Sequence, residues 1–212
     1  MELDKLGGLV VIAPRHWSEA YIGSILSENT SRVQRFISTA RQRQATPLNY
    51  GAGTMHLYLG ERYPLELKPA LGRKSNVSFN GHEIHIQSRQ HDAESVRKVL
   101  QGWYEARAMK VLNARLQTIA ARADWVRITP VPMKLRRMKR TWGNCSSSGL
   151  IKLNTHLIKA PLSVIDSVVA HEICHLQEMN HGKAFYALLE QLNPNWRADR
   201  LRLRSDARLY LQ

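Results

Sequence analysis

The sequence predicts an α+β fold, in which an N-terminal helix and antiparallel β-hairpins precede a small sheet that backs a second helical segment. Three observations lead to this prediction. Apolar side chains recur at every second position between residues 54 and 87, and at helical spacing from Asp92 to about Arg122. An apolar helix with two histidines follows Pro161. Hydrophobic residues make up 43% and charged residues 23% of the 212 residues, which excludes a collagenous or wholly disordered chain.

Residues 1–91 are expected to form a helix plus an antiparallel β subdomain. A strand at residues 8–14 ends in a proline. Ser18 then provides the side chain of an N-cap, and the apolar pattern that follows predicts a helix to about Gln44 with a break near Asn29.

The strands of this subdomain follow the helix and show the alternation of half-buried strands. Asn80-Gly81 predicts a type I′ hairpin turn between the last two, because both central residues of that turn have positive φ. The expected strands are residues 55–59, 63–67, 76–79 and 83–86.

Residues 92–212 are expected to form the second domain. Asp92 is a suitable N-cap for a long helix to about Arg122. After that helix we expect strands at 126–129 and 133–142, a Gly/Ser loop at 144–149, a strand at 150–154 and a helix beyond Pro161.

Charge is distributed unevenly along the chain. Lysine and arginine number 31 against 17 acidic residues, which gives a net charge of +14 and a pI near 10.2. Between Arg97 and Arg140 twelve basic residues face two acidic ones, an excess of ten. A field of this sign attracts polyanions, so nucleic acid is a possible partner through the basic surface, the alternative being a solvated basic face without a ligand.

Cellular location follows from what the sequence lacks. No apolar run approaches the roughly 18 residues that a membrane-spanning helix needs, and residues 1–5 have no signal-peptide pattern. Two cysteines, Cys145 and Cys174, do not make a disulfide framework and are expected to be thiols. We therefore expect a cytoplasmic protein with no membrane partner.

Two histidines stand four residues apart in the apolar helix, at His171 and His175, and Glu172 follows the first. Residues at this spacing share one helix face with Cβ atoms about 5–6 Å apart, so both imidazoles can reach one zinc ion through bonds of about 2.0–2.1 Å. Glu172 is offset about 100° around the helix and can address a metal-bound water without being a ligand. With nine histidines in the chain, this H-E-x-x-H pattern has chance odds of about 0.02.

A catalytic zinc needs a third protein ligand and an open position, and Glu178 and His181 compete for that role. On a straight helix Glu178 would lie roughly 7 Å along the axis from an ion held by the two histidines, which is too far for a carboxylate. His181 can bind only if the chain turns, and Asn180 and Gly182 are residue types that end helices. His181 is therefore favoured.

Several segments together resemble the YgjP-like metallopeptidase family, which is related to zinc peptidases of the SprT and Wss types. The resemblance extends from about Gly8 to Trp196, and the second half carries it. The chain departs from the family pattern at Thr141, Asn144 and Ile173, none of them a proposed ligand. Relatives usually carry further strand sequence before residue 8, so a shortened N-terminus is expected here. The matching segments are Met138–Ser146, Ile151–Asn154, Leu157-Ile158, Pro161, Ile165-Asp166, His171–His175 and Asn180-His181.

The resemblance implies a zincin-like catalytic domain at residues 92–212 in which His171, His175 and His181 bind zinc (Zn²⁺) and Glu172 is the catalytic acid/base. The implied activity is hydrolysis of peptide bonds in peptide or protein substrates, by a zinc-activated water with Glu172 as general base. The alternative is a basic nucleic-acid-binding protein whose zinc is structural or vestigial, or a protease that acts on DNA-bound proteins. Glu172 argues against the structural site, which has no use for a base.

Three features of the site stay open on the sequence alone. Asn144, His156 and Tyr186 are candidates for the donor that stabilises the tetrahedral oxyanion. The strand at 150–154 is either an edge with which an extended peptide pairs or a core strand. Trp142, Gly143 and Asn144 are candidates for the cleft wall, and for Trp142 the alternative is a place in the core.

Overall fold

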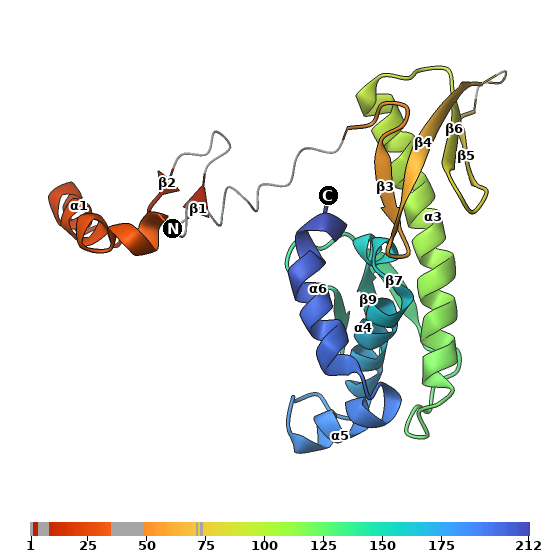
Figure 1. Ribbon diagram of the computed structural model, residues 1–212. Helices are drawn as coiled ribbons and strands as arrows, with labels where there is room; N and C mark the ends of the chain where they lie inside the picture. The colour runs from red at the N-terminus through yellow and green to blue at the C-terminus, as the bar shows by residue number, and fades with distance from the viewer. Residues whose placement is uncertain (1, 4–8, 35–48, 71, 73) are drawn as a thin grey trace. The chain divides into compact units, whose positions relative to one another are not determined.

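The structure is a computed structural model that describes residues 2–3, 9–34, 49–70, 72 and 74–212 (Figure 1). The chain forms two compact units, Met1–Pro47 and Leu48–Gln212. Helices combine with small sheets, and this confirms the predicted α+β class. The predicted domain boundary between residues 91 and 92 falls inside the second unit, between strand β6 and helix α3.

The first unit contains a short hairpin and a helix. Strand β1 (Glu2–Leu3) pairs antiparallel with β2 (Leu9–Val10), which is much shorter than the expected strand. Ser18 caps α1 (Glu19–Glu28) by accepting a hydrogen bond from the amide of Tyr21 at 3.2 Å. The helix ends at Asn29, the predicted break, and helical residues resume at 30–34. The rest of the predicted helix lies outside the described residues.

The second unit begins with a four-stranded sheet of order β3-β4-β6-β5. Hairpins β3–β4 and β5–β6 are antiparallel as predicted, but β4 pairs with β6 in parallel, so the sheet is mixed. After β4 the chain forms β5 at the edge of the sheet. Strand β6 then lies between β4 and β5 and runs in the same direction as β4. The strands are β3 (Met55–Tyr58), β4 (Glu61–Pro69), β5 (Asn76–Phe79) and β6 (Ile84–Ser88).

The β5–β6 turn differs from the predicted type I′ turn. Phe79 pairs with Ile84, which leaves a four-residue loop instead of a two-residue one. Gly81 has φ +100°, but Asn80 has no positive φ. Asn80 acts through its side chain: its Oδ1 accepts from the amides of His82 and Glu83 at 2.9 and 3.0 Å. A side-chain turn therefore takes the place of the backbone one.

Helix α3 (Ala93–Ala120) packs against this sheet and also against η1 (Thr155–Lys159) and α4 (Leu162–Cys174). Asp92 caps it as predicted, since its carboxylate accepts from the amide of Ser95 at 3.0 Å. Its buried residues recur mainly at intervals of four, as expected for one face of a helix. They are Val96, Leu100, Tyr104, Ala108, Leu112, Leu116, Ile119 and Ala120.

A second, three-stranded sheet lies beside helix α4 in the order β7-β9-β8. Strand β9 (Ile151–Asn154) pairs in parallel with β7 (Met133–Arg136) and antiparallel with β8 (Gly143–Cys145). It is thus the central strand, and not an edge that could receive a peptide. Residues 126–129 form no strand, so this prediction is wrong.

The remaining elements of the second unit are helical. The 3₁₀ helix η1 (Thr155–Lys159) leads to α4 (Leu162–Cys174), whose start after Pro161 is as predicted. Helices α5 (Lys183–Leu192) and α6 (Trp196–Tyr210) complete the chain, and both pack on α4. Within the described residues, no helix combines the length and the apolar character needed to cross a membrane.

Candidate metal centre and cleft

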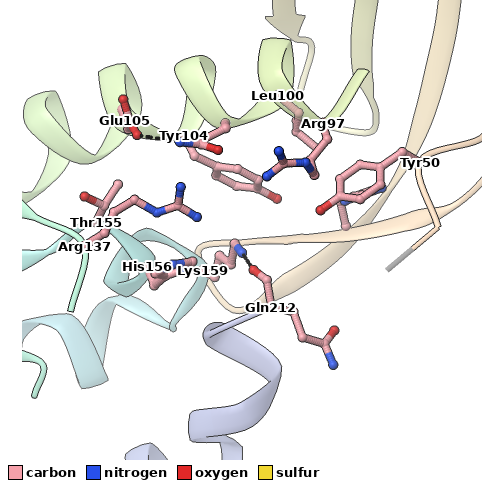
Figure 2. Close-up of a pocket in the computed structure, with 12 residues that line it drawn as sticks. Tyr50, Arg97, Leu100, Tyr104, Glu105, Arg137, Thr155, His156, Lys159 and Gln212 are labelled. Atoms are coloured by element: carbon pink, nitrogen blue, oxygen red, sulfur yellow. Dashed lines mark hydrogen bonds between the residues drawn. The ribbon is translucent and has the colours of Figure 1, made fainter. Parts of the chain in front are cut away.

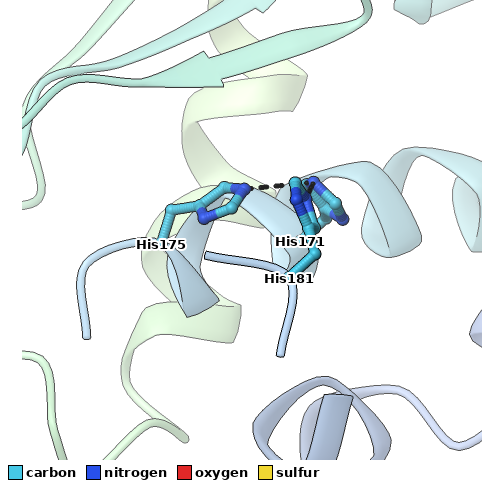
Figure 3. Close-up of side chains that lie close together, drawn as sticks. All are labelled: His171, His175 and His181. Atoms are coloured by element: carbon cyan, nitrogen blue, oxygen red, sulfur yellow. Dashed lines mark hydrogen bonds between the residues drawn. The ribbon is translucent and has the colours of Figure 1, made fainter. Parts of the chain in front are cut away.

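Two of the three histidines expected to bind metal, His171 and His175, lie at the end of helix α4. Its first turns are apolar and cross the core, with Val164 and Ile165 fully buried, so the position of its last turn is fixed by packing. His171 lies in that last turn, and His175 follows the last helical residue, Cys174. Figure 3 shows both rings projecting toward the same point beyond the helix.

The chain turns after His175 and brings His181 back to the helix end. The amides of Gln177 and Glu178 both donate to the carbonyl of Cys174, at 3.1 and 2.9 Å, which ends the helix in a tight turn. The Nε2 atom of His171 then lies 3.2 Å from Nε2 of His175 and 3.1 Å from Nε2 of His181. The chain thus turns as His181 requires, but the helix ends at Cys174, before the Asn180 and Gly182 from which the turn was expected. The three imidazoles converge (Figure 3).

The three nitrogens fit a zinc ion in spacing. Tetrahedral zinc with Zn–N bonds of about 2.0–2.1 Å separates its nitrogen ligands by about 3.3 Å. The two observed separations of 3.2 and 3.1 Å are close to this value, and one ligand atom from each of His171, His175 and His181 lies within 4.8 Å of the others. A second such group, Glu66, Glu83 and His85, lies on the four-stranded sheet, outside the cleft.

The protonation of the imidazole rings is also compatible with metal binding. Nδ1 of His175 lies 2.9 Å from the carbonyl oxygen of Glu178, which can only accept, so this ring carries its proton on Nδ1 and a lone pair on Nε2. Burial, and after it the charges of neighbouring groups such as His175 and Arg200, lower the pKa of His171 to about 4. A neutral imidazole is the form that binds metal. Glu178, the competing candidate, contributes its main chain and not its carboxylate.

Phe185 of α5 packs against all three imidazoles. The ring is fully buried, and its centroid lies 4.9 Å from that of His171, 4.7 Å from that of His175 and 4.6 Å from that of His181. The contact with Phe185 restricts the rotamers of each imidazole. The sequence analysis missed Phe185, although its place four residues after His181 on an amphipathic helix is a signal that could have found it.

Glu172 points into the cleft from the buried side of α4. Its side chain is almost fully buried, and burial raises its pKa to about 8. Its Oε2 atom has no hydrogen-bond partner, a rare state for a buried oxygen and one that fits a group awaiting a ligand or water. This is the environment of a carboxylate that exchanges protons near neutral pH.

Gly143 of β8 makes room for Glu172. A Cβ atom built on Gly143 would lie 2.7 Å from both Cγ and Cδ of Glu172 and would overlap Oε1. No other residue type fits at this position with Glu172 in place. The sequence suggested a cleft wall near Trp142, and the structure adds the close approach of backbone to carboxylate.

The cleft itself has a volume of about 610 Å³ and is lined by residues of the β7–β8 loop, α4, α5 and α6. Trp142, Tyr186 and Trp196 form much of its wall, and the rings of Tyr186 and Trp196 stack at 5.2 Å. Among the oxyanion candidates, Tyr186 lines this cleft, whereas His156 lines a different pocket and Asn144 lines neither.

Asn154, fully buried at the end of β9, holds the loop that borders the cleft. Its Nδ2 donates to the carbonyls of Met138 and Thr141 at 2.8 and 2.9 Å, and its main-chain amide donates to Trp142 at 2.8 Å. The sequence analysis noted Asn154 in the family pattern without a role, and the structure shows this positioning contact.

Two histidines one turn apart at the end of a helix, with a glutamate beside them, are typical of metallopeptidases. The family described as "YgjP-like, metallopeptidase domain" matches residues 1–206. The chain therefore belongs to the YgjP-like metallopeptidase family, as the sequence resemblance predicted.

The chain was also compared with solved structures and with curated proteins. A solved structure similar to this chain is the metallopeptidase zymogen of Pyrococcus abyssi abylysin, with 21% identity and a TM-score of 0.37. The likeness covers 47% of this chain and 93% of that one. Among curated proteins, no significant match is found.

Proposed function

We propose that this metallopeptidase is zinc-dependent, with His171, His175 and His181 as ligands and Glu172 as general base. The observation that supports it most is the convergence of three Nε2 atoms next to a buried carboxylate without a hydrogen-bond partner. When bound, zinc supplies Lewis acidity, which polarises a carbonyl and lowers the pKa of water toward about 7. Neutral nitrogen donors in a tetrahedral spacing favour zinc over calcium or magnesium, which prefer oxygen.

The residues of the chain supply proton transfer and substrate binding. Glu172 accepts a proton from the attacking water and delivers it to the leaving amine, for which a pKa near neutrality is suited. The positive charge of a cation at the three imidazoles favours the ionised carboxylate and so prepares it to act as a base. The aromatic wall of Trp142, Tyr186 and Trp196 offers apolar surface to side chains of a peptide substrate.

The nucleic-acid alternative gains no support from the family or from the fold. A structural zinc site has no need of an orphaned carboxylate, and it usually closes its fourth position with a protein ligand. Among the described residues, the histidine cluster contains three candidate ligands.

The test replaces Glu172 by glutamine, which keeps the shape of the side chain and removes its basicity. Glu172→Gln should retain about one zinc per chain and lose about 10²–10⁴-fold in the hydrolysis of a fluorogenic peptide library. Zinc is measured by elemental mass spectrometry on protein purified without chelator. Glu178→Gln is the matched control and should keep both zinc and activity. Undiminished turnover in Glu172→Gln would exclude Glu172 as the base.

A further inference from the structure

The cleft beside the proposed metal site carries positive charge that the proposed mechanism does not use. Two arginines line it, Arg140 from the loop between β7 and β8 and Arg200 from α6. Among the described residues that line this cleft, the only carboxylate is that of Glu172, the buried residue proposed as the base. The exposed part of the cleft wall therefore contains two cations and no acid.

The register of α6 places Arg200 at the cleft. Trp196, Arg200 and Leu203 all line it, and their spacing of four and then three residues puts them on one face of the helix. Trp196 is buried, and its ring stacks on that of Tyr186 with the centroids 5.2 Å apart. The packing of this helix face thus holds Arg200 at the cleft wall.

Arg200 also lies close enough to the histidines to act on them electrostatically. After burial and the charge of His175, the charge of Arg200 lowers the pKa of His181. The same charge contributes to the low pKa of His171. An anion bound by Arg200 would therefore lie near the proposed metal site, where a peptide substrate is held.

Neither arginine of the cleft has an acidic partner. Within the described residues, no carboxylate forms an ion pair with Arg140 or Arg200. By contrast, Arg197 on the same helix lies 2.8 Å from the carboxylate of Glu190. A guanidinium group without such a partner keeps its donors available to a ligand, and it carries five of them.

Cations also gather in a second pocket, between η1 and α3, but most of them have partners there (Figure 2). Figure 2 shows the ammonium group of Lys159 directed at the backbone oxygen of Gln212, to which it donates. Arg97 donates two hydrogen bonds, of 2.8 and 2.7 Å, to the carboxylate of Glu94. Two of the three cations in that pocket are thus paired, unlike the two cleft arginines within the described part of the chain.

We propose that Arg140 and Arg200 bind a carboxylate of the peptide substrate, so that peptides with a carboxylate near the scissile bond are preferred. This inference rests on the proposed function, because it assigns a substrate class to that site. Guanidinium and carboxylate match each other in a planar, bidentate geometry. Trp142 and Trp196 line the same cleft and reduce the water around such an ion pair, which strengthens it. The carboxylate belongs either to an acidic side chain or to the C-terminus of a short peptide.

The test is a binding measurement with short peptides that differ by one charge. The metal-loaded Glu172→Gln protein is titrated with fluorescent hexapeptides at constant ionic strength, and binding is followed by anisotropy. The neutral parent peptide contains glutamines and has an amidated C-terminus. It is compared with peptides that carry one glutamate at each position in turn, and with the parent that has a free C-terminal carboxylate. We expect at least one of these peptides to bind about 5-fold more tightly than the parent.

Two further substitutions in this protein test the arginines. Arg200→Gln should reduce the preference for the carboxylate to less than about 2-fold, and Arg140→Gln should reduce it as well. Arg204→Gln is the matched control for Arg200, because it removes the same charge one turn further along α6 from a residue that does not line the cleft. Lys139→Gln is the corresponding control for Arg140. Both controls should keep the preference.

A preference that is lost in Arg200→Gln and kept in Arg204→Gln supports the inference. The peptide that shows it then distinguishes an acidic side chain from a C-terminal carboxylate. Equal binding of all peptides would overturn the inference. A preference unchanged in Arg200→Gln, or lost equally in both variants, would overturn it as well, because the metal or the net charge of the chain would then be the cause.

Hydrolysis of the same peptides by the unchanged protein separates this inference from the proposed function. Turnover without a preference for a carboxylate, in binding or in rate, would overturn the inference and leave the proposed function in place. A binding preference that depends on Arg200, without turnover of any peptide, would overturn the proposed hydrolysis and leave the carboxylate site.

Discussion

At the scale of single residues, the position of each imidazole depends on a partner that is distant in sequence or that acts through its main chain. The carbonyl of Glu178 fixes the tautomer of His175, and Phe185 packs against all three rings. A site whose ligands are held before metal arrives binds more tightly, because less conformational entropy is lost on binding.

His181 is the proposed ligand whose position depends most on the turn, and its removal tests the metal site directly. We expect His181→Ala to lower zinc affinity by about 100-fold or more, because two nitrogen ligands remain. The measurement is zinc per chain after dialysis against a competing chelator. His82→Ala, an exposed histidine in the β5–β6 loop, is the control. Full zinc occupancy in His181→Ala would contradict the assignment.

His56 should make the free energy of unfolding depend on pH. Burial, and after it the charge of Lys159, lower its pKa to about 4. Between pH 6.5 and 4 the unfolded chain therefore binds a proton that the folded chain does not, so stability is lost as the pH falls through this range. His56→Gln should reduce the drop in unfolding free energy from pH 7.5 to 4.5 by about 2 kcal/mol.

Urea denaturation at the two pH values checks this prediction. The exposed His82 again offers the control, as His82→Gln should leave the drop unchanged. A drop of the same size in His56→Gln and in the unchanged protein would show that other groups cause the acid sensitivity.

At the scale of elements, strand β8 limits the position of Glu172, the proposed general base. It is an edge strand of the sheet, and its first residue, Gly143, lies against the side chain of Glu172. Helix α4 supplies Glu172, and Gly143 of β8 leaves the space for its side chain. The position of the Glu172 carboxylate therefore depends on how closely strand β8 approaches helix α4.

Gly143→Ala should therefore impair catalysis without removing the metal. The new methyl group overlaps Glu172 and displaces its carboxylate, and a misplacement of about 1 Å costs about 100-fold in rate. Peptide hydrolysis and zinc content are measured together. Gly182→Ala, beside His181, meets no atom within 4 Å and should keep both. Wild-type turnover in Gly143→Ala would show that Glu172 needs no such space.

At the scale of the whole second unit, the β3–β4 turn docks on η1 through the backbone. The amides of Leu59 and Gly60 donate to the carbonyls of Ile158 and Lys159 at 2.9 and 3.0 Å. Gly60 has φ +91°, and a Cβ there would lie 2.7 Å from Cγ and 2.9 Å from Cα of Pro161. This contact joins the four-stranded sheet to the segment that leads into α4.

Gly60→Ala should lower the free energy of unfolding by about 3 kcal/mol, since it adds a steric overlap of about 1–3 kcal/mol to the strain of a positive φ. Gly53→Ala is the matched control: Gly53 has φ +78° but nothing within 4 Å, so only the backbone strain of about 1–2 kcal/mol applies. Urea denaturation compares the two. Equal losses would show that the docking contact contributes nothing.

The sequence by itself determined the elements and residues that depend on local patterns. The caps at Ser18 and Asp92 and the break at Asn29 rest on neighbours within a few residues, and so does the pairing of histidines on one helix face. Asn180 and Gly182 predicted that the chain turns before His181, but the helix ends earlier, at Cys174, where no residue type marks a helix end.

The tertiary structure alone decided which segments meet. Strand order made β9 central and β4 parallel to β6, and this depends on pairing between segments far apart in the chain. Gly143 lies against Glu172 across such a distance. Local periodicity reports which face of an element is buried, but close packing against a particular neighbour exists only once the whole core has formed.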